Sequence, residues 1–470
     1  MVSIGLNRNC YSDNSKSVQY SCSTPDRAPH LRAAAATNLN DEERTLSINT
    51  PFPATAPTDE HPGGPTSPKS PRGLLPSMAV MSLVFFAAIT GLGQVLLPTQ
   101  LVDIDPVRKV TNLAIVTTIS FVVTVIAQPL IGAISDRTRS RLGRRAPWML
   151  IGAVIGGGLL LGVGSLTSII WLTLCWVVIQ VSLNAVIGPL SAIIPDRYPR
   201  ERRGVASAMF GVGTTLGLTV GVILSGVFAN SIGVGYSIFG IAIIIAAVLF
   251  VLINHDYSSK TATIEPFKLG KFIASFWISP RKHPDFAWAF VARFCFILGY
   301  FVVLLFQLYI LTDYIHLQIG EAHTIQGLVA VYSLVTTLIT VTTGGYWSDR
   351  LKRRKIFVYA ASVLIALGMA IPLLSPTVEG MLLMGAVSGL GFGLYTACDT
   401  ALMTEVLPRD GASAGKDLSI LNLATTFPQA VAAIVAALVI GVFGYPGLFV
   451  FAMVAVVLGG LALIPIRTVR

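Results

Sequence analysis

The sequence predicts an all-α membrane protein: twelve transmembrane helices form two pseudo-symmetric six-helix bundles, and both termini are cytoplasmic. Long apolar runs recur along the 470 residues, basic residues gather in alternate loops, and two short motifs return at one spacing. Hydrophobic residues make up 53% of the chain and charged residues 12%. That charged share is about half of what soluble proteins carry, so the composition excludes an ordinary soluble fold.

Apolar runs of helical length define the expected spans. From Met78, "MAVMSLVFFAAITGLGQVLL" holds no charge over 20 residues, and about 20 helical residues cross a bilayer core of about 30 Å. Short links such as "GYPG" force neighbouring spans into antiparallel hairpins. We expect twelve spans, over residues 77–101, 110–134, 147–166, 168–194, 204–228, 233–253, 286–312, 325–347, 356–374, 380–404, 416–442 and 445–466.

Basic residues orient these spans in the cell (cytoplasmic) membrane. The loops after the even-numbered spans hold 20 Lys and Arg residues, and the loops on the other face hold only Arg108 and Lys109. An excess of Lys and Arg marks the cytoplasmic side, so both termini are expected inside. The net charge of +10 is then mainly an orientation signal, and nucleic acid is not an expected partner.

The chain divides into four expected parts. Residues 1–75 are rich in Pro, Ser and Thr and lack the apolar core of a signal peptide, which predicts a disordered cytoplasmic tail. A regulatory tail and a start codon placed too early are the alternatives. Residues 76–253 are the N-terminal six-helix bundle and residues 286–470 the C-terminal one. The linker, 254–285, contains "PFKLGKFIASFW", which suits a short interfacial helix.

Two motifs recur about 210 residues apart. "GAISDRTRSRLGRR" at 132–145 returns as "GGYWSDRLKRRK" at 344–355, each closing the second helix of a half. "IIPDRYPRERR" follows the fourth span and "LMTEVLPRDGAS" the tenth. The repetition indicates a duplicated bundle, and a duplicated transporter holds its solute near the midplane between the halves.

These motifs carry a resemblance to a known family. G-x-x-x-D-R-x-x-x-x-x-G-R-R after the second helix resembles the signature of the major facilitator superfamily, and the resemblance covers all twelve spans. "SDRTRSRLGRRAPWMLIG", "NAVIGP" and "DLSILNLATTFPQAV" are similar to the branch of sucrose/proton symporters, their bacterial relatives and the glycoside–pentoside–hexuronide transporters. The resemblance implies the major facilitator fold, alternating access and most often a monomer.

The repeated basic motif is the expected cytoplasmic gate. In the family fold Asp136 faces the start of helix eleven, where a helix N-terminus favours a carboxylate by about 0.3–2 kcal/mol, and the arginines after it pair with Asp196. In the second copy Asp349 would face the start of helix five, and Arg353 or Arg354 would pair with Glu405. The alternative is that the arginines only mark the cytoplasmic side of the membrane and form no gate. The expected gate residues are Gly132, Asp136, Arg137, Arg144, Arg145, Asp196, Asp349, Arg350, Arg353, Arg354 and Glu405.

Two charges lie inside expected spans. Arg293 and Asp399 each lie roughly 10 Å from the cytoplasmic end of their helix, seven and ten, and charges at such depth are usually functional. We expect them to form an ion pair that borders the central cavity. The alternative is that Arg293 reaches the lipid headgroups alone, which leaves Asp399 without a partner.

Uncharged polar side chains on the helices that line the cavity in the family fold are the expected solute contacts. Amides donate and accept hydrogen bonds, and tyrosine rings stack on sugar faces, so the set suits a neutral sugar or polyol. Each amide is as readily explained as a contact between helices. The expected set is Gln94, Gln100, Gln180, Asn184, Tyr300, Gln307, Tyr395, Asn422 and Gln429.

The sequence departs from the sucrose symporters at two positions of helix four. Their proton-coupling Asp and sugar-binding Arg align with Gln180 and Ser191, and no acid lies inside helices two and four to build the cation site of the related branch. Asp399 is therefore the remaining candidate to carry a coupling proton, although a carboxylate paired with Arg293 resists protonation. A facilitator, which moves its solute without a coupling ion, is the alternative.

The expected function is secondary active or facilitative transport of a small polar solute, most of all a sugar or glycoside, across the cytoplasmic membrane. A proton-driven drug or metabolite exporter of the same superfamily is the alternative, although helix five lacks the Gly-x-x-x-Gly-Pro pattern of antiporters. An enzyme or sensor is disfavoured, because no HExxH, nucleophile or nucleotide motif is present. Five scattered cysteines indicate no metal site, and no cofactor is expected.

Overall fold

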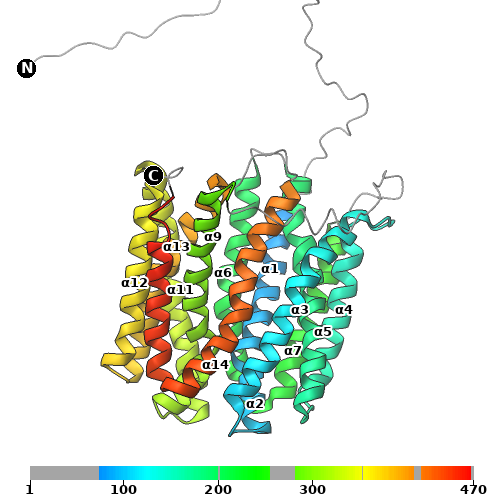
Figure 1. The fold of residues 1–470 in the computed structure, drawn as a ribbon. Helices are drawn as coiled ribbons and strands as arrows, with labels where there is room; N and C mark the ends of the chain where they lie inside the picture. The colour runs from blue at the N-terminus through cyan, green and yellow to red at the C-terminus, as the bar shows by residue number, and fades with distance from the viewer. Residues whose placement is uncertain (1–72, 199–201, 255–280, 352, 407–413, 467–470) are drawn as a thin grey trace, which may run out of the picture. The chain divides into compact units, whose positions relative to one another are not determined.

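The computed structural model describes residues 73–198, 202–254, 281–351, 353–406 and 414–466, and every regular element in these ranges is helical (Figure 1). The expected tail and linker, with its interfacial helix, lie almost wholly outside these ranges. The side chains of Asp349, Glu405 and Asn422 also lie outside the described part of the chain.

The first group of helices runs from Leu74 to Ile253. Its first span is α1 with the π-helical turn η1 and the short helix α2, which continue one another. Pro147 stands near the start of α4, where a missing amide hydrogen costs no helical bond. The elements are α1 Leu74–Gly91, η1 Leu92–Leu96, α2 Leu97–Ile104, α3 Lys109–Arg137, α4 Ala146–Val163, α5 Ile169–Arg197, α6 Arg203–Val227, η3 Ala229–Ser231 and α7 Ile232–Ile253.

The second group runs from Pro284 to Leu461. Its first span is α9, which breaks at Phe306 and continues through α10 and the π-helical turn η4. The elements are α9 Pro284–Leu305, α10 Gln307–Tyr309, η4 Ile310–Tyr314, α11 Ile319–Leu351, α12 Arg354–Leu374, α13 Val378–Val406 and α14 Ala414–Leu461.

The described chain makes twelve crossings. Eleven of its helical segments are long and apolar enough to span a membrane, and the last of them, Ala424–Leu461, has 38 residues. That segment is about 57 Å long at 1.5 Å per residue, nearly twice the bilayer core. Gly444 divides it with φ of 68°, a conformation that glycine adopts without strain. Figure 1 shows the two arms of α14 running in opposite directions. The all-α expectation is confirmed.

Helix eight differs from its expected bounds. It was expected over 325–347, and α11 instead runs from Ile319 to Leu351. Its additional first turns are polar, and a hydropathy pattern therefore misses them. His323 is only 4% exposed and Gln326 only 1%, because this end of α11 is covered by the first group.

Helices within each group approach closely through glycines. On α6, Gly213, Gly217 and Gly221 lie against α1, and a Cβ built at each would come within 2.5 Å of a backbone oxygen of that helix. On α13, Gly385, Gly389 and Gly393 meet α11 in the same way, within 2.9 Å. Small residues at four-residue spacing allow such contact in membranes.

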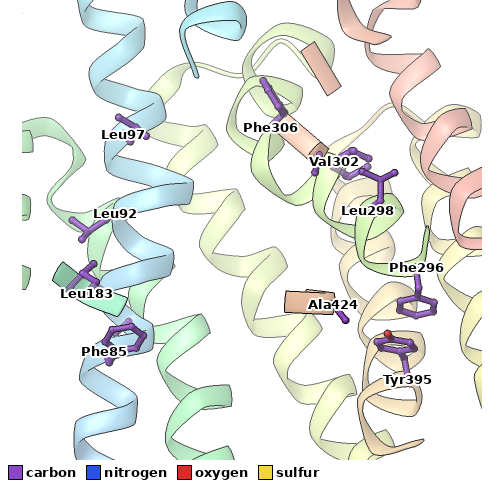
Figure 2. Close-up of a cluster of buried hydrophobic side chains, with 14 of the residues drawn as sticks. Phe85, Leu92, Leu97, Leu183, Phe296, Leu298, Val302, Phe306, Tyr395 and Ala424 are labelled. Atoms are coloured by element: carbon purple, nitrogen blue, oxygen red, sulfur yellow. The ribbon is translucent and has the colours of Figure 1, made fainter. Parts of the chain in front are cut away.

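The two groups meet along α3 with α14 and along α6 with α11. Large apolar side chains fill both groups. Figure 2 shows Phe85, Leu92 and Leu97 along the first span and Val302 and Phe306 along α9, all at most 2% exposed. We call the ends of the helices that carry Arg145 and Arg354 the basic end, and the opposite ends the far end.

Candidate functional site

The two charges expected inside the membrane lie together. Arg293 of α9 places Nη1 2.8 Å from Oδ2 of Asp399 on α13, and the two side chains are 13% and 10% exposed. Arg293 Nη2 also donates to Thr425 Oγ1 of α14 at 2.6 Å. A guanidinium presents several donors in one plane, so it joins three helices at once.

The surroundings of this pair correct one expectation. Arg293 and Asp399 border a small cavity whose other walls come from the second group alone: Ala289, Ala292, Phe296, Val358, Tyr395, Leu402, Gly459 and Leu463. Tyr395 stacks on Phe296 with the ring centres 3.5 Å apart (Figure 2). The pair and Tyr395 therefore lie within the second group, because α12 and the second arm of α14 cover them. Among the described residues, none from the first group lines this cavity.

The first copy of the basic motif holds a compact charge cluster. Arg145 contacts Asp136 at 2.7 Å and Asp196 at 3.1 Å, and Arg144 contacts Asp196 at 3.2 Å. Asp196 ends the fourth span, so the cluster ties the ends of α3 and α5 to the start of α4. Arg137 donates to Ala133 O of its own helix. The region that Asp136 was expected to face, at the start of helix eleven, lies outside the described side chains.

The second copy is described only in part. Arg350 donates to the Tyr346 hydroxyl of its own helix, and Arg353 precedes α12 with its side chain exposed. Arg354 is half-buried, and its expected acid partner, Glu405, lies outside the described side chains. Gly132 and its counterpart Gly345 both border open space, since a Cβ at either position meets no atom within 4 Å.

Two expected solute contacts are used for packing. Gln100 is 3% exposed and donates both amide hydrogens, to Val163 O and Leu166 O at the end of the third span. Gln100 was expected to contact the solute in the cavity. This expectation is wrong, because its amide joins two helices of one group. Asn184 is buried and donates to Gln180 O of its own helix.

Four of the other expected solute contacts keep their side-chain amides available. Gln94, Gln180 and Gln429 are half-buried and Gln307 is 5% exposed. Within the described ranges none of their side-chain amides makes a hydrogen bond. Tyr300 is half-buried and stacks on Phe392, with ring centres 4.6 Å apart.

An ion pair that the sequence reasoning missed joins the groups at the far end. Lys109, which begins α3, contacts Asp313 of η4 at 2.6 Å. Asp313 also accepts from the Tyr445 hydroxyl at 2.7 Å and from Thr312 at 2.8 Å. Lys109 lies 5.1 Å above the Tyr309 ring as well. The cation thus has an anion and an aromatic face, both from the second group.

A second layer of contacts lies beneath this ion pair. The Tyr309 hydroxyl donates to Pro98 O at 3.0 Å, and His323 Nε2 lies 2.9 Å from Thr99 Oγ1. Thr99 donates its own hydrogen to Val95 O at 2.6 Å, so His323 is the donor in its contact. Further into the helices Gln326 donates to the backbone oxygen of Gln94 at 3.1 Å. The first span of the first group is therefore joined to α10 by one hydrogen bond and to α11 by two.

Some signal for these contacts exists in the sequence. Lys109 is one of only two basic residues in the loops of its face, and Asp313 is the acid that follows the seventh span. Opposite charges at the same rim are candidates for a pair once the family fold places the helices side by side. His323 and Gln326 gave no such signal, because polar residues at a helix end normally face water.

No bound metal is indicated by the described residues. Within the ranges that the structure covers, no three His, Cys, Asp or Glu side chains come together in a way that would hold an ion.

Solved structures of transporters share the fold. A variant of the nucleoside transporter NupG matches with a TM-score of 0.67 and 14% identity over 84% of this chain and 99% of that one. A D-xylose–proton symporter matches with a TM-score of 0.61 and 15% identity over 85% and 98%. A bacterial homologue of the human lysosomal transporter Spinster, inward-facing and occupied, matches with 0.56 and 15% over 83% and 94%.

No protein of curated function matches the sequence. The family model of the Major Facilitator Superfamily matches residues 74–322 and 289–470, which together take in every described helix. The protein therefore belongs to the Major Facilitator Superfamily and is a secondary transporter of a small solute.

Proposed function

We propose that the protein moves a neutral, hydroxyl-rich solute, such as a sugar or glycoside, across the cytoplasmic membrane by closing its far end and its basic end in turn. The basic end is assigned to the cytoplasm because Lys and Arg gather there. The solute class follows the resemblance of its motifs to the sucrose symporters and glycoside transporters.

The observation that carries the proposal is the position of the contacts between groups. In the described ranges, hydrogen bonds and an ion pair join the groups at the far end, and a further contact lies at mid-helix, where Thr118 donates to Ala430 O. The far end is thus closed by polar contacts that side chains can make and break. Two discrete arrangements of packed helices are what alternating access requires.

The cluster of Asp136, Arg145 and Asp196 is the proposed gate at the other end. Arg145 holds Asp136, whose side chain is 52% exposed and so available to a partner from the second group. In the closed state we expect the start of helix eleven to meet Asp136, as the resemblance implies. Gly132 and Gly345 have open space at their Cβ positions, which leaves room for a closer approach of another helix.

The chemistry of the available side chains supports a neutral solute. Among the expected solute contacts in the described ranges, Gln94, Gln180, Gln307 and Gln429 have side-chain amides without a hydrogen bond. Arg293 and Asp399 neutralise each other within the second group. An ionic solute needs a counter-charge in a low-dielectric site. A solute with several hydroxyls needs only donors and acceptors, and amides supply both.

Transport of defined solutes tests the proposal. The purified full chain is reconstituted in proteoliposomes, and uptake of radiolabelled sucrose, D-xylose and uridine is measured with and without an inward proton gradient. We expect saturable uptake of at least one probe, absent from protein-free vesicles; acceleration by the gradient identifies proton coupling. Proton-driven movement of amphipathic cations, with none of these probes carried, would instead establish the exporter.

A further inference from the structure

The first helix of each group is interrupted at the equivalent place. In the first group the helix passes into the π-helical turn η1 after Gly91, and in the second it breaks at Phe306. The repeated motif sets the register between the groups, because Gly132 and Gly345 are 213 residues apart. The same spacing pairs Gly93, inside the first interruption, with Phe306.

This register also pairs two glutamines. Gln94 follows Gly93 in "GQVLLPTQ", and Gln307 follows Phe306 in "FQLYILTD", and a threonine stands five residues after each glutamine. Figure 2 labels Leu92 and Leu97 on the first span and Phe306 on the seventh, neighbours in the chain of the two glutamines. In transporters built from repeats, paired interruptions at corresponding positions of the halves mark the solute site.

The first interruption leaves one backbone carbonyl without a donor in its own helix. Pro98 has no amide hydrogen, so the Gln94 carbonyl four residues earlier loses its donor within the helix. The structure gives that carbonyl a donor from the other group, Gln326 Nε2 at 3.1 Å. Single π-helical turns inside α-helices occur often at functional sites.

Side-chain amides and free space meet at these interruptions. Gln307 is 5% exposed, yet its amide forms no hydrogen bond with any residue in the described ranges. The Gln307 amide atoms are not among the fully enclosed unpaired polar atoms of the described residues, so they remain accessible to a small solute. A Cβ built on Gly93 would meet nothing within 4 Å. The space beside Gly93 and Gln94 is therefore open, and η1 contacts both α9 and α10.

We propose that Gln94 and Gln307 are a pseudo-symmetric pair of solute contacts, one from each group, that bind hydroxyls of a neutral sugar or nucleoside beside Gly93. This inference rests on the proposed transport function and assigns its specificity to this pair. Each amide donates to one hydroxyl and accepts from another. The acid nearest to Gln307 along its span, Asp313, is neutralised by Lys109 at 2.6 Å. The acid nearest to Gln94, Asp103, lies near the end of α2 with its side chain exposed. No charged side chain stands beside the two glutamines along these spans, so the site favours a neutral solute.

Binding measurements on matched variants test the pair. The full chain is purified in detergent, and Kd is measured for sucrose, D-xylose, uridine and the charged probe glucuronate. Gln94→Leu and Gln307→Leu are each expected to weaken the neutral probe that the wild type binds by about 10- to 100-fold. Gln100→Leu is the control: it removes the same amide from the same span, and we expect lower thermal stability with an unchanged Kd.

Gly93→Ala and Gly93→Val keep the test informative if a glutamine variant fails to fold. Because open space surrounds the Gly93 Cβ position, both should fold as the wild type does, and Val should weaken binding more than Ala. Unchanged Kd in all four variants at the pair would overturn the inference while leaving transport intact. Tighter binding of glucuronate than of every neutral probe, or binding of no probe by the wild type, would overturn the solute class as well.

Discussion

Removal of either charge from the Arg293–Asp399 pair should destabilise the protein far more than removal of both. The two side chains are 13% and 10% exposed and 2.8 Å apart, so each single change leaves a buried charge without its partner. Loss of one member of a buried ion pair costs about 3–5 kcal/mol, whereas replacement of both by neutral groups is often near neutral. We therefore expect a coupling free energy of about 2–4 kcal/mol between the two sites.

The assay is thermal unfolding of the purified full chain in one detergent, for Asp399→Asn, Arg293→Met and the double variant. Both single variants should melt well below the wild type, and the double variant should recover most of the loss. The melting temperature of Arg293→Lys should lie between those of the single neutral variants and the wild type. One ammonium keeps the charge but does not reproduce the planar guanidinium that reaches both Asp399 and Thr425. A double variant that melts no higher than Asp399→Asn alone would refute the reasoning.

Three further predictions concern the two ends and the helix packing. Lys109→Ala removes a partly buried ion pair that closes the far end. If the pair contributes about 1 kcal/mol to closure, spin-label distances across that end should show a roughly fivefold larger open population. The control is Arg108→Ala, at an exposed neighbouring residue, which should leave these distances unchanged. Asp136→Asn should insert normally but slow uptake, and wild-type uptake would leave the basic run as a topology signal only. Gly213→Ala places a Cβ 2.2 Å from a backbone oxygen and should lower stability by about 1–3 kcal/mol or more, whereas Gly211→Ala, which meets nothing within 4 Å, should melt like the wild type.

The fold was predictable because its causes are local and repeated. Each span is an apolar run of bilayer length, and the basic loops and the repeated motif fix orientation and duplication without reference to packing. The ion pair of Arg293 and Asp399 was predictable for a similar reason. Two opposite charges at the same depth in the membrane are each costly to bury alone, and pairing lowers that cost. The depth of a residue follows from its distance to a helix end.

The direction in which a side chain points was less predictable. Gln100 and Tyr395 lie on helices expected to line the cavity, yet Gln100 contacts the end of the third span and Tyr395 stacks on Phe296 within its own group. Apolar spans have little periodicity, because lipid and protein neighbours are equally apolar, so the sequence does not tell which face meets the cavity. His323 was missed because its burial depends on a helix from the other group.

Distances across both ends of one molecule test alternating access most directly. Spin labels at Val107 and Leu374, exposed at the far end, and in a second sample at Leu142 and Leu351, exposed at the basic end, report the two separations by double electron–electron resonance with and without the solute that is transported. We predict opposite changes: conditions that lengthen the far-end distance shorten the basic-end distance. Two distances that stay fixed during transport, or that lengthen together, would contradict a carrier that closes its ends in turn.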